Sequence, residues 1–476
     1  MNAVLEQYES GKPITEGTLG NLTALQDAAL RDLWRRLLAI FPNSAAAAAA
    51  GNSQSAAIDT DEVDPTATLS PALSPGVSPT PPLSANPMDH SKRSSRLRQS
   101  SASPATTPTS DKQRSSSSTS WFSFGGAAKP EPTSYRQLVG DVAPESSRPP
   151  ERYSSAVMTR TAPTVRDAFW DTVLCDHPDV LLLRFLRARK WKPEDALTML
   201  LACLRWRLTE DIDWLIWTGE SRLNLALMRS GMGALHRTDR IGQPVLHIPV
   251  RLNDPKAQPL EQIVEYTIYL MEVARCVLHP PVEKVCLLVD TTDMSLANMD
   301  WNFFRTFLHY LEHYYPECLG LVLIYNASWV FNSLWKLIRP LLDPVVASKV
   351  QFAASQKDLQ RFIAPENLPI ELGGSDRFTY TYAMPTEKEN APMFDSSAYD
   401  SAADKRHTAC DDFEAATRAW ANATVSPAEF LPHARTLAAD SVIAASKAMD
   451  KYRRARTQYH RTGVIADNLT VNWESS

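Results

Sequence analysis

The chain has 476 residues and a net charge of −5, so it is long enough for two or three domains and has no general attraction for nucleic acid. Its six cysteines are scattered and include no CxxC pair, which favours free thiols in a reducing compartment. The sequence contains neither a run of about 18 uncharged apolar residues nor a signal-peptide pattern. We therefore expect a cytoplasmic protein that contacts membranes only peripherally and transiently.

Residues 1–20 are polar and predict an irregular segment. Residues 22–41 predict a helix, because apolar residues recur with helical spacing until Pro42 stops it. One interpretation is a helix on a membrane surface, with Trp34 as its interfacial anchor. The Asp and Arg residues mixed along its polar face favour instead a helix packed in a core.

Residues 43–163 have a different composition, in which Ser, Thr, Pro and Ala dominate and other apolar residues are sparse. Such a segment cannot bury enough apolar surface to offset the entropy of ordering, so we expect it to be disordered. Its Ser-Pro and Thr-Pro steps near basic residues are candidate sites for kinases, and the alternative is a plain spacer. The apolar patch WFSFGG at residues 121–126 is a candidate docking motif.

From residue 164 the apolar periodicity returns. Three segments with wide apolar faces predict helices of one layer: 165–175, 180–190 and 193–208. An alternation of strands and helices follows, which predicts an α/β domain: a hairpin at 234–248, a helix at 260–277, a strand at 284–290 and a helix at 302–313. Another strand is expected at 351–354 and a short helix at 359–362.

The centre of this domain is a buried strand at 319–325 followed by an amphipathic helix at 328–339. The only charges in that helix are Lys336 and Arg339, in its last turn. Such a helix is either buried or faces another apolar surface. Its apolar face is formed by Val330, Phe331, Leu334, Leu337 and Ile338.

After residue 375, helices are expected at 413–421 and 438–459. The second contains the basic cluster Lys451, Arg453, Arg454 and Arg456. The cluster fits a tail that touches membranes or regulates the domain. We favour helices packed on the domain surface, because charged faces of helices are commonly just solvated.

One pattern is typical of an enzyme: His309, Glu312 and His313 match the H-x-x-E-H of inverted zinc peptidases. Such a site needs a glutamate ligand from a later helix, and the sequence that follows predicts a strand, a helix and a loop instead. No phosphate-binding glycine loop and no G-x-S-x-G motif is present. We therefore expect a protein that is not an enzyme and that holds neither metal nor cofactor, with a zinc hydrolase as a remote alternative.

Isolated charges lie where the apolar segments end: Arg189, Lys190, Glu317, Asp343 and Lys349. The simplest interpretation is a set of surface ion pairs. The alternative is a polar clamp at the mouth of a lipid pocket.

Several long stretches point to a known family. LLLRFLRARKWKPEDALTML resembles the helical N-terminal part of the CRAL-TRIO lipid-binding family. Residues 313–350, together with ENLPIELGG at 366–374, resemble its lipid-binding lobe, in the form found in fungal phosphatidylinositol transfer proteins. GNLTALQDAALRDLWRRL is similar to the family's first helix, so the disordered stretch would loop out of the domain.

The resemblance implies an α/β fold in which a helical layer lies beside a mixed sheet with a hydrophobic pocket, closed by the helix at 328–339 as a gate. The expected organisation is a first helix in 1–42, the disordered insert in 43–163, the helical N-terminal part in 164–229, the lipid-binding lobe in 230–374 and a C-terminal helical extension in 375–476.

The resemblance also implies a site for the head group of phosphatidylinositol. The family's head-group residues match Arg189, Lys190, Glu317, Asp343 and Lys349 in type. Where the family's founding type has a serine and a threonine that contact phosphatidylcholine, this chain has Val285 and Leu287. The expected function is therefore transfer of phosphatidylinositol between membranes by a monomer. The alternative is a carrier or sensor of another hydrophobic ligand, such as a sterol precursor.

Overall fold

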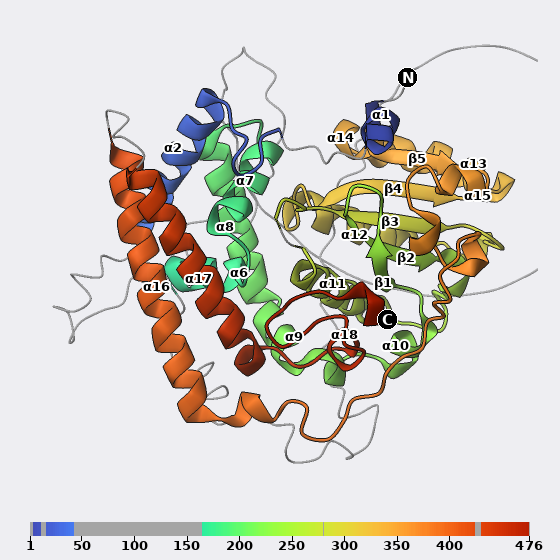
Figure 1. Ribbon diagram of the computed structural model, residues 1–476. Helices are drawn as coiled ribbons and strands as arrows, with labels where there is room; N and C mark the ends of the chain where they lie inside the picture. The colour runs from blue at the N-terminus through green and yellow to red at the C-terminus, as the bar shows by residue number, and fades with distance from the viewer. Residues whose placement is uncertain (1–2, 11–15, 42–163, 279, 424–429, 476) are drawn as a thin grey trace, which may run out of the picture. The chain divides into compact units, whose positions relative to one another are not determined.

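The computed structural model describes residues 3–10, 16–41, 164–278, 280–423 and 430–475. These residues all fall in one compact unit. The predicted disorder of residues 43–163, their candidate kinase sites and the motif at 121–126 lie outside the described residues. The mixed α/β fold is confirmed: Figure 1 shows a helical layer beside a sheet of five strands.

The helical layer consists of α2 (Ala24–Ile40), α6 (Val165–Val173), α7 (Pro178–Ala188) and α8 (Pro193–Thr209). Its core is aromatic and aliphatic, with Trp34, Phe169 and Phe185 almost completely buried. Thr23 and Thr164 start α2 and α6 through capping boxes, which fix the first turns of both helices. Trp34 therefore packs in a core, as the mixed charges on the helix's polar face favoured, and does not lie at a membrane surface.

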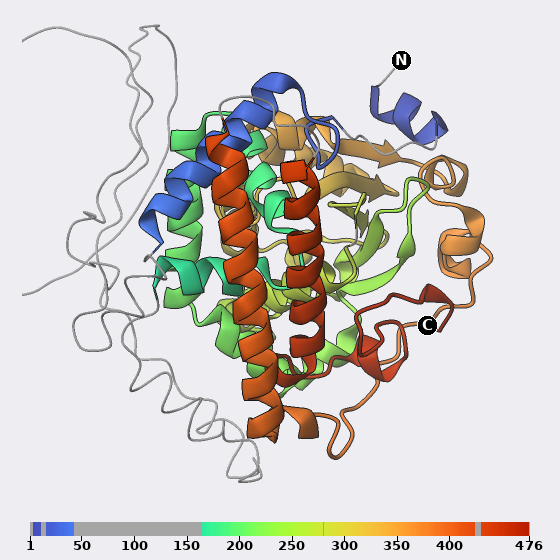
Figure 2. The same ribbon diagram turned by 60° about the vertical axis from the view of Figure 1, so that its left-hand side comes forward.

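The C-terminal extension packs against this layer through α16 (Ser396–Asn422) and α17 (Phe430–Arg453), which lie side by side in Figures 1 and 2. In its centre, the guanidinium of Arg435 donates two hydrogen bonds to the carboxylate of Asp179, to which the indole of Trp34 also donates. Burial alone would raise the pKa of Asp179, but Arg435 outweighs burial and holds that pKa below its ordinary value. The extension is therefore part of the folded core.

The sequence pattern located both helices but not their lengths. Helix α16 begins at Ser396 rather than near 413, because its first half is polar and shows little apolar periodicity. Helix α17 ends at Arg453, short of the predicted 459. In the basic cluster, Arg454 and Arg456 are buried and pair with Asp450, so the interpretation as a free membrane-touching tail is wrong for these two residues.

The sheet has the strand order β1-β2-β3-β4-β5. Strand β1 is antiparallel to β2, as the predicted hairpin requires, and all other neighbours are parallel. The strand bounds are β1 Ala234–Thr238, β2 Pro244–Pro249, β3 Val285–Asp290, β4 Leu319–Tyr325 and β5 Val350–Ala353.

Helices connect these strands: α11 (Leu260–Cys276), α12 (Trp301–His313), α13 (Trp329–Ile338), α14 (Pro344–Ser348) and α15 (Gln356–Leu359). Shorter helices complete the unit: α9 (Ile212–Thr218), α10 (Leu225–Ser230) and α18 (Gln458–Arg461). Helix α15 begins three residues before the predicted start, because Ser355 and Asp358 form a capping box. None of the described helices has the length and apolar character needed to cross a membrane.

The N-terminal segment was wrongly predicted to be irregular. Residues Ala3–Ser10 form a helix, α1, that packs on the sheet. The hydroxyl of Tyr8 donates a hydrogen bond of 2.6 Å to the Asp239 carboxylate in the turn after β1, and its ring lies edge-on to Phe362. A helix of eight residues that is held by so few tertiary contacts shows no clear apolar periodicity, so the sequence did not predict it.

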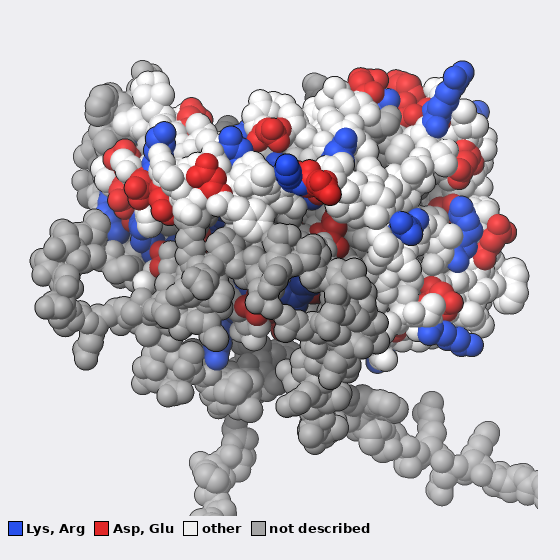
Figure 3. Space-filling model, turned by 90° about the horizontal axis from the view of Figure 1, so that it is seen from below, with Lys and Arg blue, Asp and Glu red and all other residues white. Residues whose placement is uncertain are grey.

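The charges on the described surface are mixed in sign. On the face shown in Figure 3, Lys and Arg side chains are interspersed with Asp and Glu wherever the grey atoms leave the surface visible. The charges visible on this face form no basic stripe of the kind that attracts nucleic acid, in agreement with the small net charge.

Candidate functional site

The two faces of the sheet are covered to very different degrees. On one face, alternate residues of the central strands are almost completely buried: Val245, Cys286, Leu288, Leu321 and Leu323. They lie under α1, Phe362, Ile363 and Leu368. This face is a close-packed core, as protein interiors normally are.

On the opposite face, four side chains of the same central strands are only partly buried: Leu246, Ile248, Val289 and Val322. Residues Val285 and Leu287 lie on this face too and are buried. Because β3 and β4 have a neighbouring strand on each side, the partial exposure of their side chains must come from incomplete cover above this face.

Helix α12 forms an apolar wall beside this face. Leu308 is its only buried residue, although the helix carries five aromatic side chains that are partly buried: Trp301, Phe303, Phe304, Phe307 and Tyr310. Helix α11 adds Leu260, Val264 and Met271, which are also partly buried. So many half-covered apolar groups around one sheet face leave an incompletely covered apolar surface, the kind of environment that a hydrophobic ligand requires.

Helix α13 covers one end of this site. Phe331, Leu334 and Ile338 pack against Met294 and Ile324, as the predicted gate helix requires, and Val330 is partly buried. Leu337 differs from the prediction, because its side chain is 60% exposed. Trp329, which the pattern did not single out, is 79% exposed at the start of the helix. The inner side of α13 is therefore apolar and packed, and its outer side presents Trp329 and Leu337.

The ionic groups gather where the parallel strands begin. Lys284, Glu317 and Lys349 lie just before β3, β4 and β5, and parallel neighbours start at the same edge of a sheet. The Glu317 carboxylate lies 3.4 Å from the ammonium of Lys349 and 3.7 Å from that of Lys284. We call these three residues the lysine–glutamate cluster.

The cluster has a distinct electrostatic character. Burial alone would raise the pKa of Glu317, but Lys349, Lys284 and Arg187 outweigh it and hold the pKa below its ordinary value. Burial lowers the pKa of Lys284, and the neighbouring Lys349 lowers it further. Glu317 is therefore ionised at neutral pH, where it faces more positive charge than it can neutralise.

The structure brings together only some of the predicted head-group residues. Glu317 and Lys349 are in contact, whereas Asp343 caps α14 by accepting a hydrogen bond from the Val345 amide. Arg189 is partly buried and Lys190 is exposed at the end of α7. Within the described part of the chain, neither of these two forms an ion pair with Glu317.

Two cations next to Glu317 escaped the sequence prediction. Arg187 faces Glu317 and pairs with Glu283 at 2.8 Å, and Lys284 belongs to the cluster itself. Arg187 lies in the same LRARK run as the predicted pair but within α7, whereas Arg189 and Lys190 follow its last residue. The sequence offers one indication of a role for Lys284: it is a charged residue at the start of a buried strand. Such a position lies at the edge of the sheet, where the loops before parallel strands come together.

The candidate zinc motif lies on α12. The rings of His309 and His313 are 4.3 Å apart, and Nδ1 of His313 is 3.0 Å from the carbonyl oxygen of His309. Among the residues that the structure describes, no group of three or more His, Cys, Asp or Glu is arranged to hold a metal ion.

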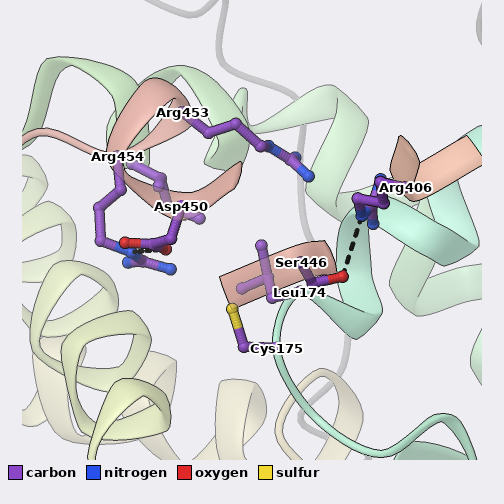
Figure 4. A pocket seen from close by; sticks show the side chains of 8 residues that line it. Leu174, Cys175, Arg406, Ser446, Asp450, Arg453 and Arg454 are labelled. Atoms are coloured by element: carbon purple, nitrogen blue, oxygen red, sulfur yellow. Dashed lines mark hydrogen bonds and ion pairs between the residues drawn. The ribbon is translucent and has the colours of Figure 1, made fainter. Parts of the chain in front are cut away.

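A separate small cavity opens between the α6–α7 turn and α17 (Figure 4). It has room for only about 10 Å³ of solvent, far below the roughly 300–1,000 Å³ typical of small-molecule sites. Its lining includes Cys175, Ser446 and Arg453, none of which lies on the sheet face described above. This cavity is too small to hold a lipid.

Comparisons with known proteins agree with this architecture. The family model described as the CRAL/TRIO domain matches residues 228–374, and the model of the CRAL/TRIO N-terminal domain matches residues 134–202. A CRAL-TRIO domain-containing protein of Schizosaccharomyces pombe is 37% identical over 307 residues, which cover 63% of this chain and 69% of the relative.

Two further relatives carry functional names. The phosphatidylinositol transfer protein CSR1 of Eremothecium gossypii is 32% identical over 312 residues, 63% of this chain and 71% of the relative. The Sec14 cytosolic factor of Schizosaccharomyces pombe is 28% identical over 214 residues, 41% of this chain and 74% of the relative. The chain therefore belongs to the CRAL-TRIO family of lipid-binding and transfer proteins.

Proposed function

We propose that this protein binds phosphatidylinositol and transfers it between membranes without chemical conversion. The observation that carries the proposal is the incompletely covered apolar sheet face, whose strands begin at the lysine–glutamate cluster. One relative that the chain matches over most of its length is named a phosphatidylinositol transfer protein, which supports the same ligand.

Free-energy considerations explain why such a site needs ions. A buried CH₂ group gains roughly 0.8 kcal/mol in a bilayer and about as much in an apolar pocket, so burial of the acyl chains nearly cancels in extraction. Contacts with the head group must then decide which lipid is taken. A phosphodiester needs a cation when it leaves water, and Lys349 supplies one, while Glu317 accepts hydrogen bonds from inositol hydroxyls.

The other predicted head-group residues keep their proposed roles from the family resemblance. Arg189 and Lys190 at the end of α7, and Asp343 at the start of α14, would contact the head group once α13 and the loops around it rearrange on lipid entry. The transfer cycle needs no cofactor.

The outer side of α13 supports the membrane step. Trp329 and Leu337 are largely exposed on it, and Leu341 and Val345 continue the apolar surface beyond the helix. A helix with few charges enters the interface of a bilayer at low cost, and its movement opens the site toward the lipid. We propose a cytoplasmic monomer that docks transiently on membranes through this surface.

One observation favours a second candidate function. The buried part of the open sheet face carries Val285 and Leu287, which offer no hydrogen bond to a second phospholipid head group. Their apolar side chains suit a wholly hydrophobic second ligand, such as a sterol precursor, in exchange for phosphatidylinositol.

Transfer between liposomes tests the primary function. We expect Glu317→Ala and Lys349→Ala each to reduce phosphatidylinositol transfer at least tenfold, since charge-assisted contacts contribute about 1.5–3 kcal/mol. Circular dichroism should show that both variants remain folded. Lys357→Ala, at an exposed site on α15, is the matched control and should transfer at the wild-type rate. Wild-type rates in both cluster variants would contradict the proposed head-group site.

A further inference from the structure

The lysine–glutamate cluster contains one more positive than negative charge. Two nearby arginines do not change this balance, because each pairs with a carboxylate outside the cluster. Arg187 pairs with Glu283 at 2.8 Å, and Arg184 pairs with Asp176 at 3.2 Å. Glu317 can neutralise only one of Lys284 and Lys349, so a single positive charge remains.

This surplus charge is largely withdrawn from water. The side chains of Lys284, Glu317 and Lys349 are 21%, 17% and 15% exposed. Water therefore screens the surplus charge poorly, and two ammonium groups compete for one carboxylate oxygen, Oε2 of Glu317. Burial lowers the pKa of Lys284, and the second ammonium group, that of Lys349, lowers it further. A bound anion would relieve this shortage of negative charge.

Lys284 lies at the sheet edge where the strands of the incompletely covered face begin. Lys284 contacts the Glu317 carboxylate just before β3 begins, and Lys349 contacts the same carboxylate just before β5 begins. A head group held at Glu317 therefore meets Lys284 on the β3 side and Lys349 on the β5 side. The two lysines flank one carboxylate, an arrangement that suits a group with a single negative charge beside hydroxyl groups.

We propose that Lys284 is a specificity-determining residue, which binds the phosphate of the lipid and selects phospholipids of net charge −1 over zwitterionic and uncharged ones. This inference rests on the proposed lipid-transfer function and adds a residue and a charge class to it. A phosphodiester with an uncharged inositol brings the cluster to neutrality. A zwitterionic head group carries its own cation besides the phosphate, so the surplus positive charge of the cluster is not neutralised.

The test compares three methionine variants of the full chain, Lys284→Met, Lys349→Met and the exposed control Lys357→Met. Transfer of phosphatidylinositol and of an uncharged lipid, diacylglycerol, is measured from vesicles that contain each in phosphatidylcholine. We expect Lys284→Met to lower phosphatidylinositol transfer about tenfold or more, the effect of one lost charge-assisted contact, and to leave any diacylglycerol transfer unchanged. The control should match the wild type.

Lys284→Arg separates the role of charge from a role in folding. It should retain most of the phosphatidylinositol transfer even if Lys284→Met folds poorly, because the cation is kept. Lys284→Met transfer at the wild-type rate would overturn the inference, as would an equal loss for both lipids in a folded variant or failure of Lys284→Arg to transfer phosphatidylinositol. Absence of phosphatidylinositol transfer by the wild type would instead overturn the proposed function itself.

Discussion

The buried carboxylate of Glu272 shows how single residues join the parts of this fold. On α11, it accepts hydrogen bonds from Arg207 of α8 at 2.7 Å, from the Tyr315 hydroxyl at 2.8 Å and from Arg275 at 3.2 Å. Burial alone would raise its pKa, but Arg207 and Arg275 outweigh it and lower the pKa to about 2. One side chain thus connects the helical layer with the loop that leads to Glu317.

The free energy of unfolding should depend on pH in a way that reflects the hydrogen bonds of Glu272. Because the pKa of Glu272 is lower in the folded than in the unfolded state, its stabilisation is present above about pH 4.5 and is lost as the pH falls toward 2. The shift corresponds to about 3 kcal/mol. We expect Glu272→Gln to lower the free energy of unfolding by about that amount at pH 7 and to flatten its fall with acid.

Urea denaturation between pH 7 and pH 3 measures this effect. Glu261→Gln, at an exposed position on the same helix, is the control and should follow the wild type. An unchanged acid dependence in Glu272→Gln would show that other carboxylates dominate the acid sensitivity.

At the scale of elements, α13 has two sides with separate roles. The inner side packs on Met294 and Ile324, and the outer side exposes Trp329 and Leu337. Periodicity alone grouped Leu337 with the buried face, because residues on the edge of an apolar stripe look alike in sequence whichever way the helix rolls. The structure fixes that roll.

Vesicle binding tests the outer side of α13. We expect Leu337→Ser to weaken binding roughly tenfold, since insertion of one leucine contributes about 1–2 kcal/mol. Leu25→Ser is the matched control, because Leu25 is 84% exposed on α2, away from the proposed docking surface. Sedimentation with phospholipid vesicles measures both. Equal binding by Leu337→Ser and Leu25→Ser would place the docking surface elsewhere.

Most elements of the α/β lobe could be predicted from the sequence, and β4 matches its predicted bounds. Their apolar periodicity is strong because each buries one face. What the sequence could not predict depends on tertiary contacts, such as the docking of α1 through Tyr8 and the polar first half of α16. The same limit applies to the site: the motif match identified Glu317 and Lys349, but the nearness of Lys284 emerges only when three strand ends meet.

At the scale of the whole molecule, the described residues combine an apolar site with a rigid support. Helices α16 and α17 close the helical layer, and the Arg435–Asp179 pair lies in its core. The last residues tie the support to the sheet, because the Leu235 amide of β1 donates to the Tyr459 hydroxyl. Compared with this support, the half-covered sheet face and α13 are less closely packed, so we expect conformational change to occur there.

Native mass spectrometry tests the central claim most directly. The purified full chain is incubated with vesicles that contain phosphatidylinositol, phosphatidylcholine and a sterol, and is then re-isolated. A lipid seated on the apolar sheet face, with its phosphate at the lysine–glutamate cluster, predicts a complex with one phosphatidylinositol molecule that weakens in Lys349→Ala. A chain recovered without lipid, or with the sterol alone, would contradict this account.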